Sequence, residues 1–309
     1  MPAMHIYQIL TPHVSRRELD PGFEVLDNSA NERPDWFEYW PIRKFLLGTA
    51  LDETAFYGFL SPKFKLKTGL SSAAVREFVL AADSPVEVVL FSPSIHNSAY
   101  YLNVFEHGDA EHPGLKDAAG RLFARLGLPD DLETLVSDSR NTVYSNYFIA
   151  KPRFWRAWLG INERLFAIAE APADPLGQAL RAATSYRGGH RVQMKVFIME
   201  RIASWLLCTD GSFAARVRDP FAARSRVYKL PVALVCDALK IACTTQHRAQ
   251  YREVFFMIRG LRSALNIQIR LAGALRFPRV AACLRTLKSY WPADERGAGP
   301  GRQESERQE

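Results

Sequence analysis

The pattern of apolar and polar residues alternates between short β-prone runs and longer stretches with helical spacing. Runs rich in β-branched or aromatic residues predict strands at 5–10, 55–60, 86–91 and 143–149. Helical patterns lie between and after them, at 36–47 with an interruption at Pro41, at 71–82 with Ser71 as N-cap, and at 99–105, 114–126 and 193–207. Strands that alternate with helices across short polar loops predict an α/β fold.

The clearest helix follows the fourth strand. Pro152 suits the first helical position, and the next large apolar residues repeat at intervals of 4, 3, 4 and 3: Phe154, Trp158, Ile161, Leu165 and Ile168. Ahead of this helix, Ser145 and Asn146 interrupt an apolar strand. Ligands bind at strand ends in open α/β sheets, so these residues indicate a pocket; a buried Asn paired with the backbone is the alternative.

From about residue 232 onward the pattern is helical, and its apolar stripe is amphipathic: Val254, Ile258, Leu261, Leu265, Ile269 and Ala272. Residues 252–288 hold eight basic side chains and one acidic one, which accounts for the whole net charge of +7. A basic stretch confined to one helical region fits anionic lipid at least as well as nucleic acid, and no nucleic-acid-binding signature accompanies it. We therefore expect an α/β domain over 1–230, a basic helical region over 231–292 and a disordered tail over 293–309.

The composition changes this picture little. The chain is 48% hydrophobic and 24% charged, as in ordinary soluble domains. The four cysteines form no CxxC pair and read as reduced core thiols, and neither a signal peptide nor an apolar run of about 18 residues is present. These features predict a cytoplasmic protein.

Four polar stretches lie at predicted strand or helix ends. The first contains Asp27, Asn28, Asn31 and Arg33, which suit either ligand hydroxyls or helix caps. The second offers Ser61, Lys63, Lys65 and Lys67 just before a helix, where cations and free backbone N–H groups hold a diphosphate; a solvated lysine run is the alternative, and the Walker order is absent.

The third stretch, 92–114, has carboxylates, amides and imidazoles that suit a general base or an ion such as Mn²⁺, Mg²⁺ or Zn²⁺, notably His96, Asn97, Glu106 and His107. Its spacing matches no closed metal signature, so a histidine-rich surface loop is the alternative. The fourth stretch contains Asn146, Tyr147 and Lys151. Apart from these, Glu200 is a lone carboxylate in an apolar helix and is either functional, paired with Arg201 or Lys195, or solvent-facing.

The order of these motifs resembles bacterial glycosyltransferase-like families of capsule, O-antigen and other surface-polysaccharide loci. It reads DN-x2-N, EYWPIRKFL, YGFLSPKF, VVLFSP, SNYFIAKPRFWRAWLGINERLFAI and FIMERIASWLL across residues 5–207. The resemblance implies a GT-A-like, Rossmann-related fold that transfers a sugar from a nucleotide-sugar donor to a glycan acceptor. Together with the basic helical C-terminus, it leads us to expect a lipid-linked acceptor at the cytoplasmic face of the inner membrane.

The resemblance also implies roles for residues. It places Asp27, Asn28 and Asn31 near the donor, Tyr57, Gly58, Ser61 and Lys63 in the segment at and after the second strand, and Asn146 in the sugar pocket. From the polar stretches described above, we expect Arg33, Lys67, His96, Asn97 and Lys151 to bind the donor as well. Glu200 and Arg201 fall on an "ER" pair, and Glu106, His107 and Glu200 are the catalytic candidates.

One departure concerns the metal. Many GT-A enzymes hold Mn²⁺ or Mg²⁺ with an Asp-x-Asp after a central strand, because the ion neutralises the leaving diphosphate. Here VEVVLF continues into SPSIHNS. The lysines replace the ion, the 106–112 segment supplies it, or the protein is a non-catalytic scaffold of a polysaccharide assembly complex.

Overall fold

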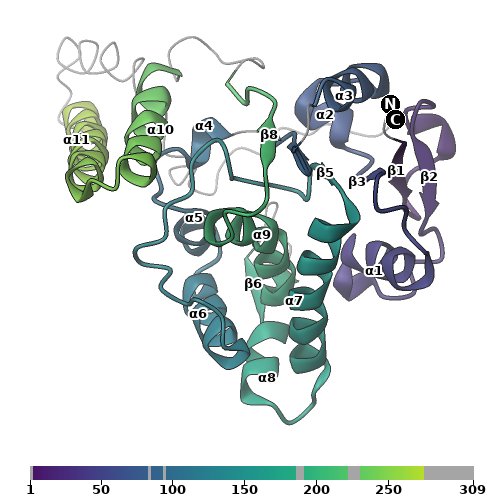
Figure 1. Cartoon of the computed structure of the whole chain (residues 1–309). Coiled ribbons are helices and arrows are strands. Elements are labelled where there is room, and N and C mark those ends of the chain that lie inside the picture. The colour runs from purple at the N-terminus through teal and green to yellow at the C-terminus, as the bar shows by residue number, and fades with distance from the viewer. Residues whose placement is uncertain (1–2, 83–84, 93–94, 186–190, 222–229, 275–309) are drawn as a thin grey trace.

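A six-stranded mixed sheet forms the centre of the molecule (Figure 1). The computed structural model describes residues 3–82, 85–92, 95–185, 191–221 and 230–274, without the side chains of 96–97, 185, 230–231 and 262–274. The sheet has the order β2-β1-β3-β5-β4-β8. Its strands are β1 (Met4–Leu10), β2 (Glu24–Asp27), β3 (Phe56–Leu60), β4 (Val88–Leu90), β5 (Phe148–Ala150) and β8 (Ala215–Val217). The predicted α/β fold is confirmed at this level.

The direction of the strands brings several loops to one edge of the sheet. β5 runs antiparallel between β3 and β4, whereas the other neighbouring strands are parallel. The carboxyl ends of those five strands therefore share an edge with the amino end of β5. We call this the carboxyl edge, and it is where ligands bind in open α/β sheets.

Helices cover both faces of the sheet. The α-helices are α1 (Tyr39–Gly48), α2 (Phe64–Thr68), α3 (Ser72–Leu80), α4 (Ile95–Ser98), α5 (Val104–Glu111), α6 (Leu115–Leu126), α7 (Pro152–Glu170), α8 (Pro175–Arg181), α9 (Met194–Thr209), α10 (Leu230–Thr245) and α11 (Ala249–Ala274). Short 3₁₀ turns span Arg16–Glu18 and Pro34–Trp36, and β6 (Ala183–Ser185) pairs with β7 (Arg191–Gln193) in a small hairpin.

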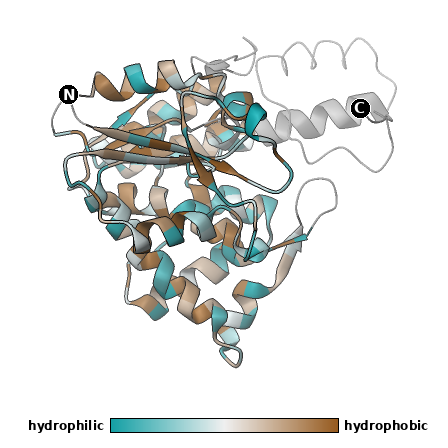
Figure 2. Cartoon of the chain, turned by 90° about the vertical axis from the view of Figure 1, so that its right-hand side faces the viewer, coloured by the Kyte–Doolittle hydropathy of each residue, from teal (hydrophilic) through white to brown (hydrophobic). Residues whose placement is uncertain are grey.

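Side chains alternate between the two faces of the sheet along each strand, so the molecule has one apolar core on each face of the sheet. Phe56 and Leu60 point to the face under α2 and α3, where they join Val75 and Val79. Residues of the opposite parity, such as Phe59, join the larger core with α1, α7 and α9. In Figure 2 the helices lie above and below the sheet, so both of its faces are covered.

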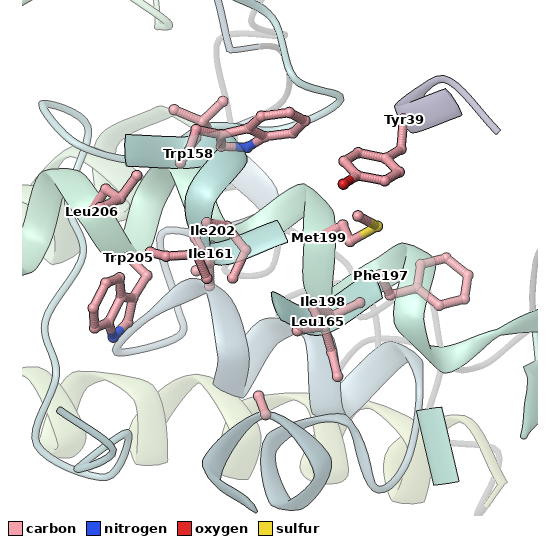
Figure 3. Packing of buried hydrophobic residues seen from close by; sticks show 14 of the residues in the cluster. Tyr39, Trp158, Ile161, Leu165, Phe197, Ile198, Met199, Ile202, Trp205 and Leu206 are labelled. Carbon is pink, nitrogen blue, oxygen red and sulfur yellow. The ribbon is translucent and has the colours of Figure 1, made fainter. Parts of the chain in front are cut away.

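The larger core is built around α7 and α9 (Figure 3). The predicted stripe of α7 faces this core, with Phe154, Trp158 and Leu165 fully buried, and Pro152 opens the helix as expected. Helix α9 is buried nearly all round, since it also packs against α5, α6 and α8.

Several predicted elements differ in the structure. Residues 143–147 are not a strand, because Ser145 and Asn146 adopt left-handed backbone angles with φ of 58° and 52°. The predicted helix at 99–105 is wrong: Asn103 caps a helix that begins at Val104 and runs to Glu111, within the stretch for which a histidine-rich surface loop was the alternative. Pro41 lies in the first turn of α1, where it interrupts nothing. The sequence patterns also missed β2, β8 and the β6-β7 hairpin, which are short.

Helices α10 and α11 lie side by side against the α4 and α5 region (Figure 1). Phe255 is fully buried with Tyr100 and Cys236 in a third apolar cluster. Of the predicted stripe, Ile258 packs against this cluster, whereas Val254 and Leu261 are exposed. The rest of the basic region beyond residue 274, Cys283 and the predicted tail at 293–309 lie outside the described residues. Over the described helices, none is apolar enough across a sufficient length to span a membrane.

Candidate functional site at the carboxyl edge

Two half-buried glutamates from different elements are electrostatically coupled. Glu38 immediately precedes α1, and Glu200 lies in α9. Burial, and then the negative charge of Glu200, raise the pKa of Glu38 to about 7. Burial likewise raises the pKa of Glu200, although the charges of Arg201 and Lys67 favour its ionised form. A carboxyl group whose pKa lies near neutral is suited to exchanging a proton during a reaction.

Two lysines supply positive charge to these carboxylates. The charge of Lys67, on α2, lowers the pKa of both Glu38 and Glu200, and that of Lys63 lowers the pKa of Glu38. Lys67 also donates a hydrogen bond of 2.9 Å from Nζ to Ser145 Oγ, and its Nζ lies 5.4 Å from the centre of the Tyr147 ring. The lysines and glutamates therefore form one charged group at the carboxyl edge.

Hydroxyl groups from two neighbouring strands meet beside this group. Ser61 directly follows β3 and Tyr147 directly precedes β5, and their side-chain oxygens are 2.5 Å apart. This contact depends on the antiparallel direction of β5, which brings its first residue to the carboxyl edge. Burial raises the pKa of Tyr147, and the charges of Glu38 and Glu200 raise it further, so the phenol remains protonated.

Asn146 lies between Ser145 and Tyr147, both of which contact the site. The residue is 6% exposed, and its Oδ1 has no hydrogen-bond partner among the described residues. A buried acceptor left unpaired costs about 1–3 kcal/mol. Its left-handed backbone is one that Asn tolerates better than most residues. An orphaned acceptor at the carboxyl edge is what a ligand hydroxyl or amide would satisfy.

Arg201 acts on Glu200 through its charge, while its guanidinium is held in place by backbone carbonyls. The buried Arg201 guanidinium donates to the backbone carbonyls of Val104 and Phe197, at 2.8 Å and 2.5 Å. Gly108 is required for this approach, since a Cβ there would lie 2.5 Å from Arg201 Nε. Lys195, the other partner predicted for Glu200, pairs instead with Asp35 at 2.6 Å.

The two catalytic candidates on α5 are placed differently from each other. Glu106 accepts a hydrogen bond from the Leu102 backbone N–H and forms an ion pair with Arg259 of α11. His107 lies closer to the site, because its Nδ1 is 2.9 Å from the Tyr144 hydroxyl, and Tyr144 interacts electrostatically with Glu200. His107 therefore lies near Glu200, whereas Glu106 links α5 to α11.

Some predicted donor residues lie farther along the same edge. Asp27 ends β2, and its Oδ1 accepts from the Ser29 backbone N–H. The Asn28 N–H donates to the Leu10 carbonyl at the end of β1, and Asn31 adopts a φ of 44° in the following turn. The 27–31 loop thus borders the carboxyl edge at the β1 and β2 end, with no hydrogen bond or ion pair in the described chain linking it to the glutamate pair.

Other predicted donor residues have contacts elsewhere. Arg33 bonds Asp35 and Glu170. Tyr57 is buried within β3, and Gly58 allows close strand packing, since a Cβ there would lie 2.6 Å from Ile149 Cγ1. Lys151 follows β5 and so lies at the opposite edge of the sheet, with its Nζ 5.5 Å from the Phe56 ring centre. The side chains of His96 and Asn97 lie outside the described residues.

The site residue that sequence reasoning missed is Glu38. It stands in the aromatic "EYW" element, which entered the family resemblance as a motif, yet its carboxylate was not singled out. A carboxylate flanked by Phe37 and Tyr39 was the available signal. Phe37 has a positive φ of 48°, and this turn sets the direction in which the chain enters α1.

The site offers little to a divalent cation. Among the described side chains, no group of three or more His, Cys, Asp or Glu residues comes together as metal ligands. Lys63 and Lys67 lie near the glutamate pair, and their positive charges oppose the binding of a divalent metal ion there. Asp109, in the segment considered as a metal source, accepts from the backbone N–H groups of Gly114 and Lys116. These residues do not fit the Mn²⁺ or Mg²⁺ that the family resemblance implies.

Comparisons of this chain with protein-family models, with curated proteins and with solved structures gave no match.

Proposed function

We propose that this protein is a glycosyltransferase of the GT-A-like type that moves a sugar from a nucleotide-sugar donor to a glycan acceptor. The observation that carries the proposal is the convergence of Glu38, Glu200, Lys63 and Lys67 at the carboxyl edge. Asn146 lies at the same edge, next to Ser145, and its buried Oδ1 has no hydrogen-bond partner among the described residues. Lysines suit a diphosphate, an amide suits sugar hydroxyls, and a carboxylate near neutral pKa suits an acceptor proton. The motif order of the sequence supports the same reaction class.

In the proposed reaction, an acceptor hydroxyl oxygen attacks the anomeric carbon of the donor sugar. The bond between that carbon and the diphosphate oxygen breaks as the new glycosidic bond forms. Glu38 takes the acceptor proton, and the nucleoside diphosphate leaves with its negative charge balanced by Lys63 and Lys67. Burial keeps the pKa of Glu38 high, and the charge of Glu200 raises it further, since two neighbouring carboxylates resist simultaneous ionisation.

A transfer assay with matched glutamate variants tests the proposal. Release of nucleoside diphosphate is measured over UDP-, GDP-, dTDP- and CMP-sugars (nucleoside monophosphate for the last), with glycan and lipid-linked acceptors. We expect Glu38→Gln to lower turnover roughly 10²-fold or more, as loss of a general base does. Glu53→Gln is the control, because Glu53 is exposed, pairs with Arg156 and precedes β3 at the opposite edge. Equal turnover in both variants would remove Glu38 from the mechanism.

A non-catalytic binding protein of a polysaccharide assembly complex is the alternative, favoured by the absence of an Asp-x-Asp motif. It predicts nucleotide-sugar binding without turnover in every acceptor tested. The near-neutral pKa of Glu38 favours the enzyme, because a purely binding site gains nothing from a half-buried carboxylate that exchanges protons.

A further inference from the structure

Exposed apolar side chains are concentrated on the two C-terminal helices. Of the eleven large apolar side chains exposed within the described part of the chain, six belong to α10 and α11. On α11, Val254, Met257 and Leu261 are spaced by three and four residues and so share one helical face, with exposures of 37%, 59% and 56%. Leu234 and Val235 are exposed near the start of α10. We call these five residues the hairpin surface.

The two helices are antiparallel neighbours joined by a short connection, so the exposed residues of α10 and α11 lie along the same stretch of the helix pair. Residues 246–248 separate α10 from α11, and the helices pack along each other. The start of α10 therefore lies beside the part of α11 near residue 260. Scattered apolar residues are normal on a protein surface, whereas a contiguous apolar patch marks a place of interaction.

The opposite sides of both helices are fixed to the body. Phe255 is fully buried, Lys240 donates to the Tyr101 carbonyl at 3.1 Å, and Asp237 accepts two hydrogen bonds from Ser139. Arg259 forms an ion pair with Glu106. The hairpin surface thus faces away from the body, and covering it does not require the helices to detach.

The charge of the adjoining sequence identifies the partner. From residue 262 to 288 the chain has six basic residues and no acidic one, and the first two, Arg262 and Arg270, continue along α11. Each basic residue near an anionic bilayer adds about 1 kcal/mol of binding. Exposed aliphatic side chains joined to a run of positive charge suit the interface of an anionic membrane, where the apolar part enters the acyl boundary and the cations meet the headgroups.

We infer that the hairpin surface docks the protein on an anionic phospholipid bilayer. The inference deepens the proposed function, because a lipid-linked acceptor would be presented at such a bilayer. It stands apart from the proposed function in its evidence, since none of the site residues contributes to the hairpin surface.

Vesicle co-sedimentation of the full chain tests the inference. Wild-type protein is mixed with vesicles of phosphatidylcholine alone or of phosphatidylcholine with phosphatidylglycerol, without any nucleotide sugar. We expect binding to the anionic vesicles, weakened by added salt, and roughly tenfold or greater loss for the double variant Met257→Asp with Leu261→Asp. Leu47→Asp is the matched control, because Leu47 on α1 is exposed to the same 56% as Leu261.

Each other outcome overturns the inference. Equal sedimentation with neutral and anionic vesicles, or equal loss for Leu47→Asp, would show that the hairpin surface is not the docking site. If the wild type binds no vesicles but is dimeric, and the double variant is monomeric, a second copy covers the surface. If the wild type is monomeric and unbound and the double variant melts earlier, residues 275–309 of the same chain cover it. Nucleotide-sugar binding, measured separately by calorimetry, shows whether the proposed function fails independently.

Discussion

At the scale of single residues, the property that matters at the site is the raised pKa of Glu38, and this comes from the surroundings of the side chain in the folded protein. Its neighbours on the chain are aromatic. The carboxylate that acts on it comes from α9, and the two lysines come from the segment that follows β3. Burial and the charge of Glu200 make ionisation unfavourable, while the lysines oppose this only in part. The folded protein therefore holds a proton on Glu38 at pH values where the unfolded chain has released it.

This proton linkage predicts how stability changes with pH. The pKa of Glu38 is raised from 4.5 to about 7, so its contribution to folding is fully present below about pH 4.5 and is lost as pH rises towards 7. Glu38→Gln should match the wild type near pH 4. Near pH 8 it should be more stable, by on the order of 3 kcal/mol at most, since no buried charge has to form. Denaturant unfolding at the two pH values measures the difference.

Glu32→Gln is the control for this measurement. Glu32 is exposed, and hydrogen bonds from Lys44 and Trp40 lower its pKa, which is the opposite direction. Its removal should give no gain in stability at high pH. A Glu38→Gln variant whose free energy of unfolding relative to the wild type is the same at both pH values would contradict the raised pKa.

At the scale of elements, hydrophobic periodicity predicted the helix α7, whose position is set by packing, and missed the turn at Ser145 and Asn146, which is set by backbone angles. The spacing in α7 identified a helix and its buried face, because large apolar residues at that spacing have only one compact arrangement. The same reasoning extended a strand through Ser145 and Asn146, where the backbone instead turns with two consecutive positive φ angles. Local apolar content cannot reveal such a turn, since Lys67 and Ser61 from another part of the chain contact it.

The packing of α11 gives a matched prediction from two adjacent phenylalanines. Phe255 is fully buried against the body, whereas Phe256 is 42% exposed. Phe255→Ala should lower the free energy of unfolding by about 3 kcal/mol or more because it leaves a cavity. Phe256→Ala should change it by less than about 0.5 kcal/mol. Thermal or denaturant unfolding distinguishes the two, and similar losses would mean that α11 packs in another rotation.

At the scale of the whole molecule, the α/β fold and several residues of the candidate site could be predicted from the sequence. Lys63, Lys67, Ser61, Asn146 and Glu200 were all singled out in advance, because each is a polar residue in or beside an apolar element. Their assembly could not be predicted, since it depends on the single antiparallel strand β5 between β3 and β4. Glu38 acquires its properties only when α9 packs near it, which no local pattern records.

The positive charges at the site also predict that transfer activity does not depend on a divalent metal ion. In the proposed reaction, Lys63 and Lys67 would take the electrostatic role that a metal ion fills beside a leaving diphosphate. Transfer activity should therefore be unchanged by EDTA and not increased by Mn²⁺ or Mg²⁺, as measured by release of the nucleotide product. Loss of activity in EDTA, restored by one of these ions, would show that donor phosphates and protein oxygens together build a metal site.

The most direct test of the central claim is calorimetric binding of nucleotide sugars to the wild type and to two lysine variants. Lys67 acts on both glutamates, whereas Lys65, two residues away and also exposed, acts on Asp20 instead. We predict that one class of nucleotide sugar binds the wild type and Lys65→Ala with similar affinity, and binds Lys67→Ala roughly tenfold or more weakly. Absence of binding for every nucleotide sugar, or equal weakening by both substitutions, would contradict a donor site at the carboxyl edge.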